Sequence, residues 1–340
     1  MDQYTLQSGS DELALVLGQQ PAPGPLGNRH VVVRMMAASL NYRDLLCRGD
    51  LEGTRQGLVP LSDGAGEVIE VGSGVSRWRP GDRVSPAFFP KWRSGPFRPE
   101  HLAEALGGSN TDGVLQSLFV AHEDAFVRIP DRLSFAEAAT LPCAGVTAWH
   151  ALFERDQVGP DHTILVQGTG GVSIIALQLA HAAGAKVIVT SSSDAKLAIA
   201  KSMGAWAGVN YKTAPDWDQA VLDLTDGRGA DHILELGGPD TYNRSINCLA
   251  FGGTISQIGV LTGFGSKPDI TPLQFKNGRI NGICVGSVEH FERLMAFVEA
   301  HAITPRVSKT FKWSGAAEAY EALRRSDHFG KVVINIQDHS

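Results

Sequence analysis

The chain has 340 residues, of which 43% are hydrophobic and 19% charged, enough to bury a large core and to indicate two domains. Its net charge of −6 comes without a basic stripe, which argues against nucleic acid as a partner. The four cysteines, Cys47, Cys143, Cys248 and Cys284, form no C-x-x-C pair, which argues against a disulfide framework or a zinc knuckle. The N-terminal residues lack the pattern of a signal peptide, so we expect a cytoplasmic protein.

The first part of the chain predicts a mostly β module. Short apolar runs separated by glycine occur at 31–33, 66–72 and 81–84, as expected for short strands joined by frequent turns. The segment 89–113 is rich in Pro, Gly, Trp and Arg and has no clear period, so we expect a long loop over a site. Its Trp92 and Phe97 are either an apolar wall for a substrate or ordinary packing residues.

Beyond residue 131 the pattern changes to strands that alternate with helices, which is typical of a parallel sheet. A helix is expected at about 172–183, and strands are expected at 163–166, 185–190, 208–211, 232–236, 254–259 and 280–285. Six such strands make a complete doubly wound dinucleotide-binding fold. The uncharged stretch 162–185 is long enough to suggest a membrane span, but its glycines and polar residues favour a strand, turn and helix, so we expect no membrane insertion.

Two helical stretches, 288–301 and 314–325, precede a final strand-like run at 331–336. We expect this strand to rejoin the first module.

A glycine turn follows the first strand of the alternating region. It has the sequence Gly168-Thr169-Gly170-Gly171-Val172-Ser173 and opens the predicted helix, with serine where the fingerprint usually ends in Gly or Ala. Backbone N–H groups and the dipole at a helix N-terminus bind a pyrophosphate, and glycines allow it to approach closely. The turn therefore predicts a dinucleotide site; the alternative is a glycine-rich β–α turn without a ligand.

The residues after the second strand decide between NAD and NADP. An acidic residue there would bind the ribose 2′-OH of NAD, but this chain has Ser191, Ser192 and Ser193. These hydroxyls, with Lys196 and Tyr211, could hold a 2′-phosphate, so the sequence favours NADPH. Two alternatives remain open: Asp194 could be the ribose ligand, although we interpret it as the cap of the next helix, and Lys196 could be a solvated surface residue.

Several motifs in the same order resemble the medium-chain dehydrogenase/reductase superfamily, and within it the zinc-independent branch that includes quinone oxidoreductases. They are SLNYRD at 39–44, DGAGEV at 63–68, GDRV at 81–84, LPCAGVTAW at 141–149 and GKVV at 330–333. The resemblance implies an α/β protein with a GroES-like, mostly β catalytic domain at 1–130 and 288–340. It also implies a Rossmann domain, a doubly wound parallel sheet that binds NADPH, at 131–287, with the cofactor in the cleft between the two domains.

The resemblance further assigns residues to the two ends of the cofactor. Gly168, Gly170, Gly171 and Val172 are expected near the pyrophosphate. The residues expected near the nicotinamide are Thr147, Gly259, Val260, Gly286 and Ser287. Proteins of this kind often form homodimers through the last Rossmann strand, here 280–285, so we expect a homodimer.

Zinc alcohol dehydrogenases of the superfamily bind catalytic zinc through a Cys, the His of a Gly-His-Glu sequence and a second Cys. The matching places in this chain hold Asn41, Ser62 and Cys143, so one plausible ligand remains where three are usual. The segment 89–113 contains no cysteine and therefore cannot provide the second, structural zinc site. We expect no metal, and we interpret Cys143 as a small buried residue.

Without a metal to polarise a simple ketone, a conjugated acceptor is the easier substrate, because its π-system spreads the incoming charge. The hypothesis is NADPH-dependent hydride transfer to a quinone or an α,β-unsaturated carbonyl. Asn41 and Tyr42 are the expected donors to the substrate oxygen, and Arg43 and Asp44 are expected to position them or carry a proton. Alternatively, Arg43 and Asp44 form a structural ion pair, and Tyr42 stacks on the nicotinamide or packs in the core.

Two other functions remain open. One is a metal-independent alcohol dehydrogenase or ketone reductase, and the other is a non-catalytic NADPH-binding protein.

Overall fold

The computed structural model describes residues 1–265 and 267–337, and the chain divides into two compact units. The flanking unit comprises Met1–Val146 and Gly286–Ser340, and the central unit comprises Thr147–Val285. Residues 131–146, which the sequence analysis assigned to the central domain, cluster with the flanking unit. The reason is that the short helix α3 (Phe135–Ala138) packs on strands of that unit, and the Ser39 hydroxyl donates to Ala139 O.

The flanking unit is built on a sheet that, within the described residues, has seven strands. Its path is β14-β15-β3-β4-β5-β7, with β6 paired to β3. The bounds are β3 His30–Ser39, β4 Asp63–Val71, β5 Arg83–Pro86, β6 Leu118–His122, β7 Phe126–Arg128, β14 Val307–Lys312 and β15 Lys331–Asn335. Strand β15 pairs antiparallel with β3, which confirms that the C-terminal strand rejoins the first module. A separate hairpin pairs β1 (Asp2–Gln7) with β2 (Ala14–Gln19).

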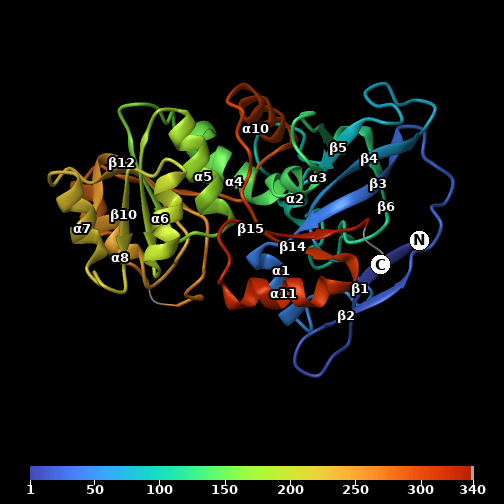
Figure 1. Ribbon diagram of the computed structural model, residues 1–340, viewed down its shortest axis with the longest axis horizontal. Helices are drawn as coiled ribbons and strands as arrows, with labels where there is room; N and C mark the ends of the chain where they lie inside the picture. The colour runs from blue at the N-terminus through green and yellow to red at the C-terminus, as the bar shows by residue number, and fades with distance from the viewer. Residues whose placement is uncertain (266, 338–340) are drawn as a thin grey trace. The chain divides into compact units, whose positions relative to one another are not determined.

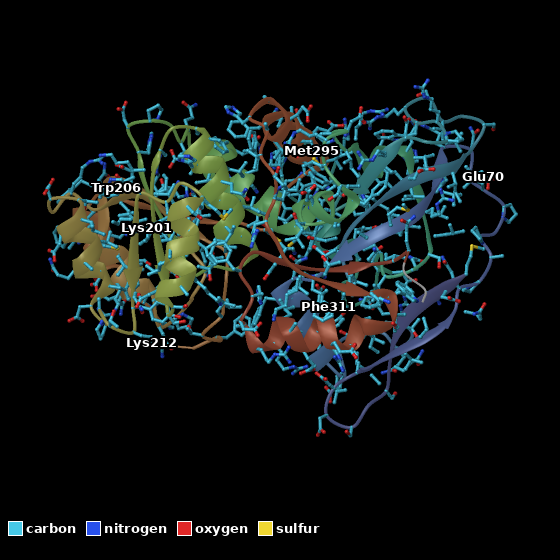
Figure 2. All side chains as sticks on the ribbon, viewed as in Figure 1. Glu70, Lys201, Trp206, Lys212, Met295 and Phe311 are labelled. Carbon is cyan, nitrogen blue, oxygen red and sulfur yellow. The ribbon has the colours of Figure 1, made fainter. Side chains whose placement is uncertain are left out.

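Strand β3 lies in the middle of this sheet and is apolar along most of its length. Val31, Val33 and Met35 are buried in a core that also contains Trp313 and Tyr320. Helix α11 (Ala316–Arg325) covers the core with its buried face, because its apolar residues recur at helical spacing. The remaining helices of this unit are α1 (Tyr42–Gly49), α2 (Pro99–Ala103) and α10 (Val288–Ala300), and Figure 2 labels Met295 of α10.

The segment 89–113 is more buried than expected for a long surface loop. It contains α2, and Trp92 is only 3% exposed, because its ring packs against Phe89 and Phe97. The Trp92 carbonyl also accepts a hydrogen bond from Val288 N at the start of α10. Of the two interpretations offered for Trp92, the structure therefore supports the packing residue.

The central unit contains the predicted parallel sheet, and Figure 1 shows its strands with the helices α5 and α6 beside them. The strand order is β10-β9-β8-β11-β12-β13, and every neighbouring pair is parallel. The strands are β8 Thr163–Gln167, β9 Lys186–Ser191, β10 Ala207–Asn210, β11 Ala230–Glu235, β12 Leu249–Gln257 and β13 Arg279–Gly282. The α-helices that lie wholly in this unit are α5 Gly171–Ala182, α6 Asp194–Ser202, α7 Trp217–Leu224, α8 Tyr242–Asn247 and α9 Thr271–Phe275, and the short α4 (Val146–Trp149) begins one residue before it. The strand order reverses between β8 and β11, where open α/β sheets bind their ligands.

The uncharged stretch 162–185 forms β8, the glycine turn and α5, as predicted. In the part of the chain that the structure describes, no helix has both the length and the apolar character needed to cross a membrane.

Candidate functional site

The glycine turn joins β8 to α5. Gly168 has a φ of 75°, a conformation that favours glycine, and Gly170 is the residue before the first turn of α5. A Cβ added at Gly168 or Gly170 would meet no protein atom within 4 Å. The glycines thus leave open space beside the N-terminus of a 12-residue helix, which fits a pyrophosphate. Ser173, at the last fingerprint place, donates to Gln167 O at 2.7 Å and so closes the turn.

A buried polar network, which the sequence analysis did not identify, lies beside this turn. Gln167 Nε2 donates to Glu235 Oε2 at 2.8 Å, and the hydroxyls of Thr241 and Ser245 also donate to the Glu235 carboxylate. Gly238 N donates to Glu235 Oε1 at 3.0 Å. The network connects the carboxyl ends of β8 and β11, the two strands between which the order reverses. The sequence feature that could have revealed this network is a polar residue at the end of each strand, Gln167 after the apolar run of β8 and Glu235 after the apolar Ile233 and Leu234 of β11.

The predicted 2′-phosphate residues lie at the ends of β9 and β10. Ser191 is buried at the end of β9, and Tyr211 N donates to Ser191 O, which holds the two strand ends together. Ser192 is exposed, Lys196 is half-buried in the first turn of α6, and Tyr211 is exposed. Ser191, Ser192 and Tyr211 therefore come from two neighbouring strand ends at one edge of the sheet, and Lys196 comes from the helix that follows β9.

Asp194 begins α6, as predicted, but the prediction that it caps the helix is wrong. The cap is Ser193, which has an extended backbone and whose hydroxyl accepts from Lys196 N at 3.4 Å. Asp194 is the first residue of the helix, and its carboxylate accepts from Asn210 Nδ2 at 2.7 Å.

The residues expected near the nicotinamide are divided between the units. Thr147, Gly259 and Val260 belong to the central unit, and Gly286 and Ser287 to the flanking unit. A Cβ at Gly259 would lie 2.3 Å from Leu236 O, so the chain requires glycine there.

Ser287 is the buried N-cap of α10, since its hydroxyl accepts from His290 N at 3.2 Å. The sequence analysis did not predict this structural role.

The four predicted catalytic residues open helix α1. Asn41 N donates to Asp44 Oδ2 at 2.7 Å, so the Asp44 carboxylate helps to cap the helix. Asp44 Oδ1 is buried without a hydrogen-bond partner among the described residues, and Arg43 Nη1, at 3.9 Å, donates instead to Leu106 O. The Arg43–Asp44 ion pair, which was one of the two alternatives, is therefore long. Tyr42 is 41% exposed, so it is not packed in the core.

The environment of Asp44 favours its neutral form. Burial raises the pKa of this carboxyl to about 6, against the opposing effects of Arg43, the Asn41 N–H and Lys331, while Asp63 raises it further.

A second charged group, Lys331, lies next to Asn41. Lys331 begins β15 and is 3% exposed. Its Nζ donates to Asn41 Oδ1 at 2.5 Å and to Leu40 O at 2.6 Å, and lies 3.5 Å from Asp63 Oδ2. Ser39 of β3 is opposite both Val333 of β15 and Asp63 of β4, so the sheet brings the segments together.

The three places that match zinc ligands all contact this ion pair. Asn41 accepts from Lys331, the Ser62 hydroxyl donates to Asp63 Oδ1 at 2.7 Å, and Cys143 N donates to Asp63 Oδ2 at 3.2 Å. The sequence analysis quoted Asp63 and Lys331 only as parts of motifs. For Lys331 the signal was a charged residue at the start of the apolar run of β15, whereas Asp63 is buried at the start of β4 and no local pattern marks it.

This donor set does not fit a catalytic zinc. An amide and a hydroxyl replace two of the three ligands, and the buried ammonium of Lys331 would repel a cation. Burial and the nearby Asp63 raise the pKa of the Cys143 thiol far above its usual range, which disfavours the thiolate that binds metal. The Cys143 thiol is enclosed, as predicted for a small buried residue, although the residue as a whole has intermediate exposure. The described residues contain no group of three His, Cys, Asp or Glu side chains suited to a metal ion.

Comparisons with known proteins agree with the fold. Residues 27–131 match the alcohol dehydrogenase GroES-like domain, and residues 171–300 match the family described as zinc-binding dehydrogenase. A zinc-type alcohol dehydrogenase-like protein of Schizosaccharomyces pombe is 44% identical, over 97% of this chain and 96% of its own. A quinone oxidoreductase of Pseudomonas aeruginosa is 34% identical, over 96% of each chain.

Among solved structures, an NAD-dependent alcohol dehydrogenase is 31% identical and superposes with a TM-score of 0.88, covering 99% of this chain and 100% of its own. The chain belongs to the medium-chain dehydrogenase/reductase superfamily. It is an oxidoreductase of that type, and the family binds a nicotinamide cofactor.

Proposed function

We propose that this protein is an NADPH-dependent oxidoreductase that transfers a hydride to a quinone or an α,β-unsaturated carbonyl without catalytic zinc. The observation that carries the proposal is that the zinc-ligand places hold Asn41, Ser62 and Cys143, and that all three contact the buried Lys331–Asp63 ion pair instead of a metal-binding set. Such a cluster offers hydrogen bonds and fixed charge but no Lewis acid. Conjugated acceptors suit it because they spread the incoming negative charge over several atoms.

The nicotinamide, when bound, supplies the hydride. The turn at Gly168, Thr169, Gly170, Gly171 and Val172 would hold the pyrophosphate with its backbone N–H groups. Asn41 and the exposed Tyr42 would donate hydrogen bonds to the substrate oxygen. Arg43 and Asp44 keep the start of α1 in place through the Leu106 carbonyl and the Asn41 N–H.

The preference for NADPH rests on the ends of β9 and β10. Ser191, Ser192, Lys196 and Tyr211 provide hydroxyls and a cation, the groups that bind a phosphate. Asp194, the alternative ligand for a ribose 2′-OH, is engaged with Asn210. One similar structure is described as NAD-dependent, so the cofactor needs a direct test.

The second candidate is a metal-independent alcohol dehydrogenase or ketone reductase. It is favoured by the alcohol dehydrogenase names of several relatives, including the one with 44% identity. A protein that binds NADPH without turnover is the third candidate.

A homodimer is part of the proposal. Strand β13 is the edge of the central sheet, and its backbone edge is unpaired within the described residues. Phe251 and Phe275 near this edge are 80% and 73% exposed, and the hydrogen bond from Gly252 N to Lys276 O joins their segments. A second copy of the chain would cover both, and sedimentation velocity of wild-type protein and Phe275→Ser tests this: a monomeric wild type would contradict it.

The reaction is tested by following NADPH oxidation at 340 nm with a panel of quinones and enones, and then NADH with the same acceptors. Turnover of conjugated acceptors with lower KM for NADPH is expected, together with less than stoichiometric zinc in the purified protein. Chelator-insensitive oxidation of simple alcohols without enone turnover would favour the second candidate. Tight NADPH binding with no turnover of any acceptor would favour the third, and stoichiometric zinc would contradict the metal-free site.

A further inference from the structure

The ammonium group of Lys331 is buried, and each of its donors faces an oxygen atom. Nζ donates to Leu40 O and Asn41 Oδ1 and lies 3.5 Å from Asp63 Oδ2. An ammonium group carries three hydrogens and no acceptor; two of them are used in these hydrogen bonds, and the third is left for the ion pair with Asp63. Lys331 therefore has no donor left for a substrate, and any effect on the reaction must pass through its partners or its charge.

The side-chain amide of Asn41 is oriented by this lysine. Because an ammonium group can only donate, the amide oxygen must face Lys331 and the amide nitrogen must point away. Asn41 Nδ2 is buried and has no hydrogen-bond partner among the described residues. A buried donor left unpaired destabilises the folded protein, so an orphan of this kind calls for a ligand.

The other polar atoms of the cluster are already occupied. Asp63 Oδ1 accepts from the Ser62 hydroxyl, and Oδ2 accepts from Cys143 N and faces Lys331. Asp44 Oδ2 accepts from Asn41 N, and Asp44 Oδ1 has Arg43 Nη1 at 3.9 Å. Asn41 Nδ2 is the donor that remains available in the cluster.

We propose that Lys331 is a positioning residue, which aims Asn41 Nδ2 at the carbonyl oxygen of the substrate and places a fixed positive charge behind it. This inference rests on the proposed function. When an enone accepts a hydride at its β-carbon, the π-electron pair moves onto the carbonyl oxygen, the nicotinamide is oxidised, and a proton from water completes the product. Asn41 donates to that oxygen while it carries the charge, and Lys331 strengthens the donor because it polarises the amide.

The kinetic test uses Lys331→Met, Asn41→Ala and the double variant, with NADPH and the best conjugated acceptor. Loss of one oxyanion donor lowers kcat by about 10²-fold, so each single variant should lose about that factor with little change in the acceptor KM. The double variant should be hardly slower than Asn41→Ala, because both changes remove the same donor. Additive losses would contradict a role exerted through Asn41.

A matched control is Lys309→Met on the neighbouring strand β14. Lys309 also pairs with a carboxylate, Asp327 at 3.0 Å, but it is 40% exposed and its carboxylate partner is not a member of the cluster. Its replacement should leave kcat at the wild-type value. If Lys331→Met is no slower than Lys309→Met in a protein that turns over enones, the positioning role is wrong and the proposed function stands.

A second readout needs no turnover. 4-Nitrophenol presents an oxygen that gains charge on ionisation, so wild-type protein should bind its phenolate more tightly and lower its pKa, as measured by absorbance titration. Lys331→Met and Asn41→Ala should both lose this shift, and Lys309→Met should keep it. A wild type that shifts the probe but reduces no acceptor would contradict the proposed reaction and retain the positioning role; no shift in wild type would contradict the role.

Lys331→Met leaves Asp63 buried without its cation and could unfold the protein. The variant Asp63→Asn/Lys331→Met removes both charges and keeps the cluster neutral. This double variant should melt near the wild-type temperature, which shows that it folds. It should nevertheless fail to lower the pKa of 4-nitrophenol and should lose about 10²-fold in kcat. Full activity and a full shift in this variant would overturn the proposal.

Discussion

The glycine turn of the central unit and the Lys331 cluster of the flanking unit are both built at strand ends, but they are assembled in opposite ways. The turn is one continuous stretch, 167–173, defined by local backbone geometry. The cluster joins Lys331 to Asn41, 290 residues earlier in the chain, through the pairing of β15 with β3. A continuous site can be identified from a motif, whereas a dispersed site depends on which strands become neighbours.

The two sites also differ in packing. The glycines of the turn leave space beside a helix N-terminus, and the cluster is filled by opposite charges that satisfy one another. Changes in the turn should therefore alter binding with little effect on stability, whereas changes in the cluster should alter stability as well. The following predictions test this difference.

The largest expected effect is on the stability of the cluster. Asp63→Asn leaves the Lys331 ammonium without its counter-charge, and breaking a buried ion pair in this way costs about 3–5 kcal/mol. Urea unfolding should show this loss, and Asp63→Asn/Lys331→Met should recover most of it. Equal stability of wild type and Asp63→Asn would mean that the pair is solvated in solution.

Asp44 should make stability depend on pH. Its pKa is raised to about 6 by burial, so the folded state favours the protonated form, and ionisation removes stability as pH rises from about 4 to 6. Asp44→Asn should unfold at higher urea than wild type above pH 6, by roughly 3 kcal/mol, and should match it near pH 4. Asp50→Asn, an exposed position just beyond the same helix, controls for loss of a charge; a constant difference at all pH values would contradict this account.

In the glycine turn, Gly170→Val should weaken NADPH binding without unfolding the protein. Its backbone is extended and its Cβ would meet no protein atom, so the side chain occupies only the space expected for the pyrophosphate. Overpacking of about 1–3 kcal/mol corresponds to an increase in Kd of about 5- to 150-fold, measured by NADPH fluorescence. Gly159→Val, which also points into open space, is the control and should bind NADPH normally.

The smallest effect is expected at the 2′-phosphate. Lys196→Met should lower kcat/KM for NADPH about tenfold, the value of one charge-assisted hydrogen bond, and leave NADH unchanged. Lys201→Met, farther along α6 and labelled in Figure 2, should change neither cofactor. Equal losses with NADPH and NADH would show that Lys196 does not distinguish them.

Much of the fold could be predicted, because apolar periodicity and glycine position follow from local physics. The parallel strands of the central unit and the return of β15 to the first module were predicted within a few residues. The errors involve competition between neighbours. Ser193, rather than Asp194, has the extended backbone that a cap needs. For Trp92 the sequence left two interpretations open, and the contacts with Phe89 and Phe97 decided for the packing residue.

The sequence by itself determined the glycine turn and the succession of strands and helices along the chain, since both depend on residues close together in the chain. It also identified Asn41, Ser62 and Cys143 as the residues in the zinc-ligand places. Only the tertiary structure decided what joins them: β3 lies between β15 and β4, which brings Lys331 and Asp63 to the end of the strand that leads to Asn41. An ion pair between residues so distant along the chain forms only when the sheet forms, because sheet pairing excludes water and supplies the partners that a buried charge requires.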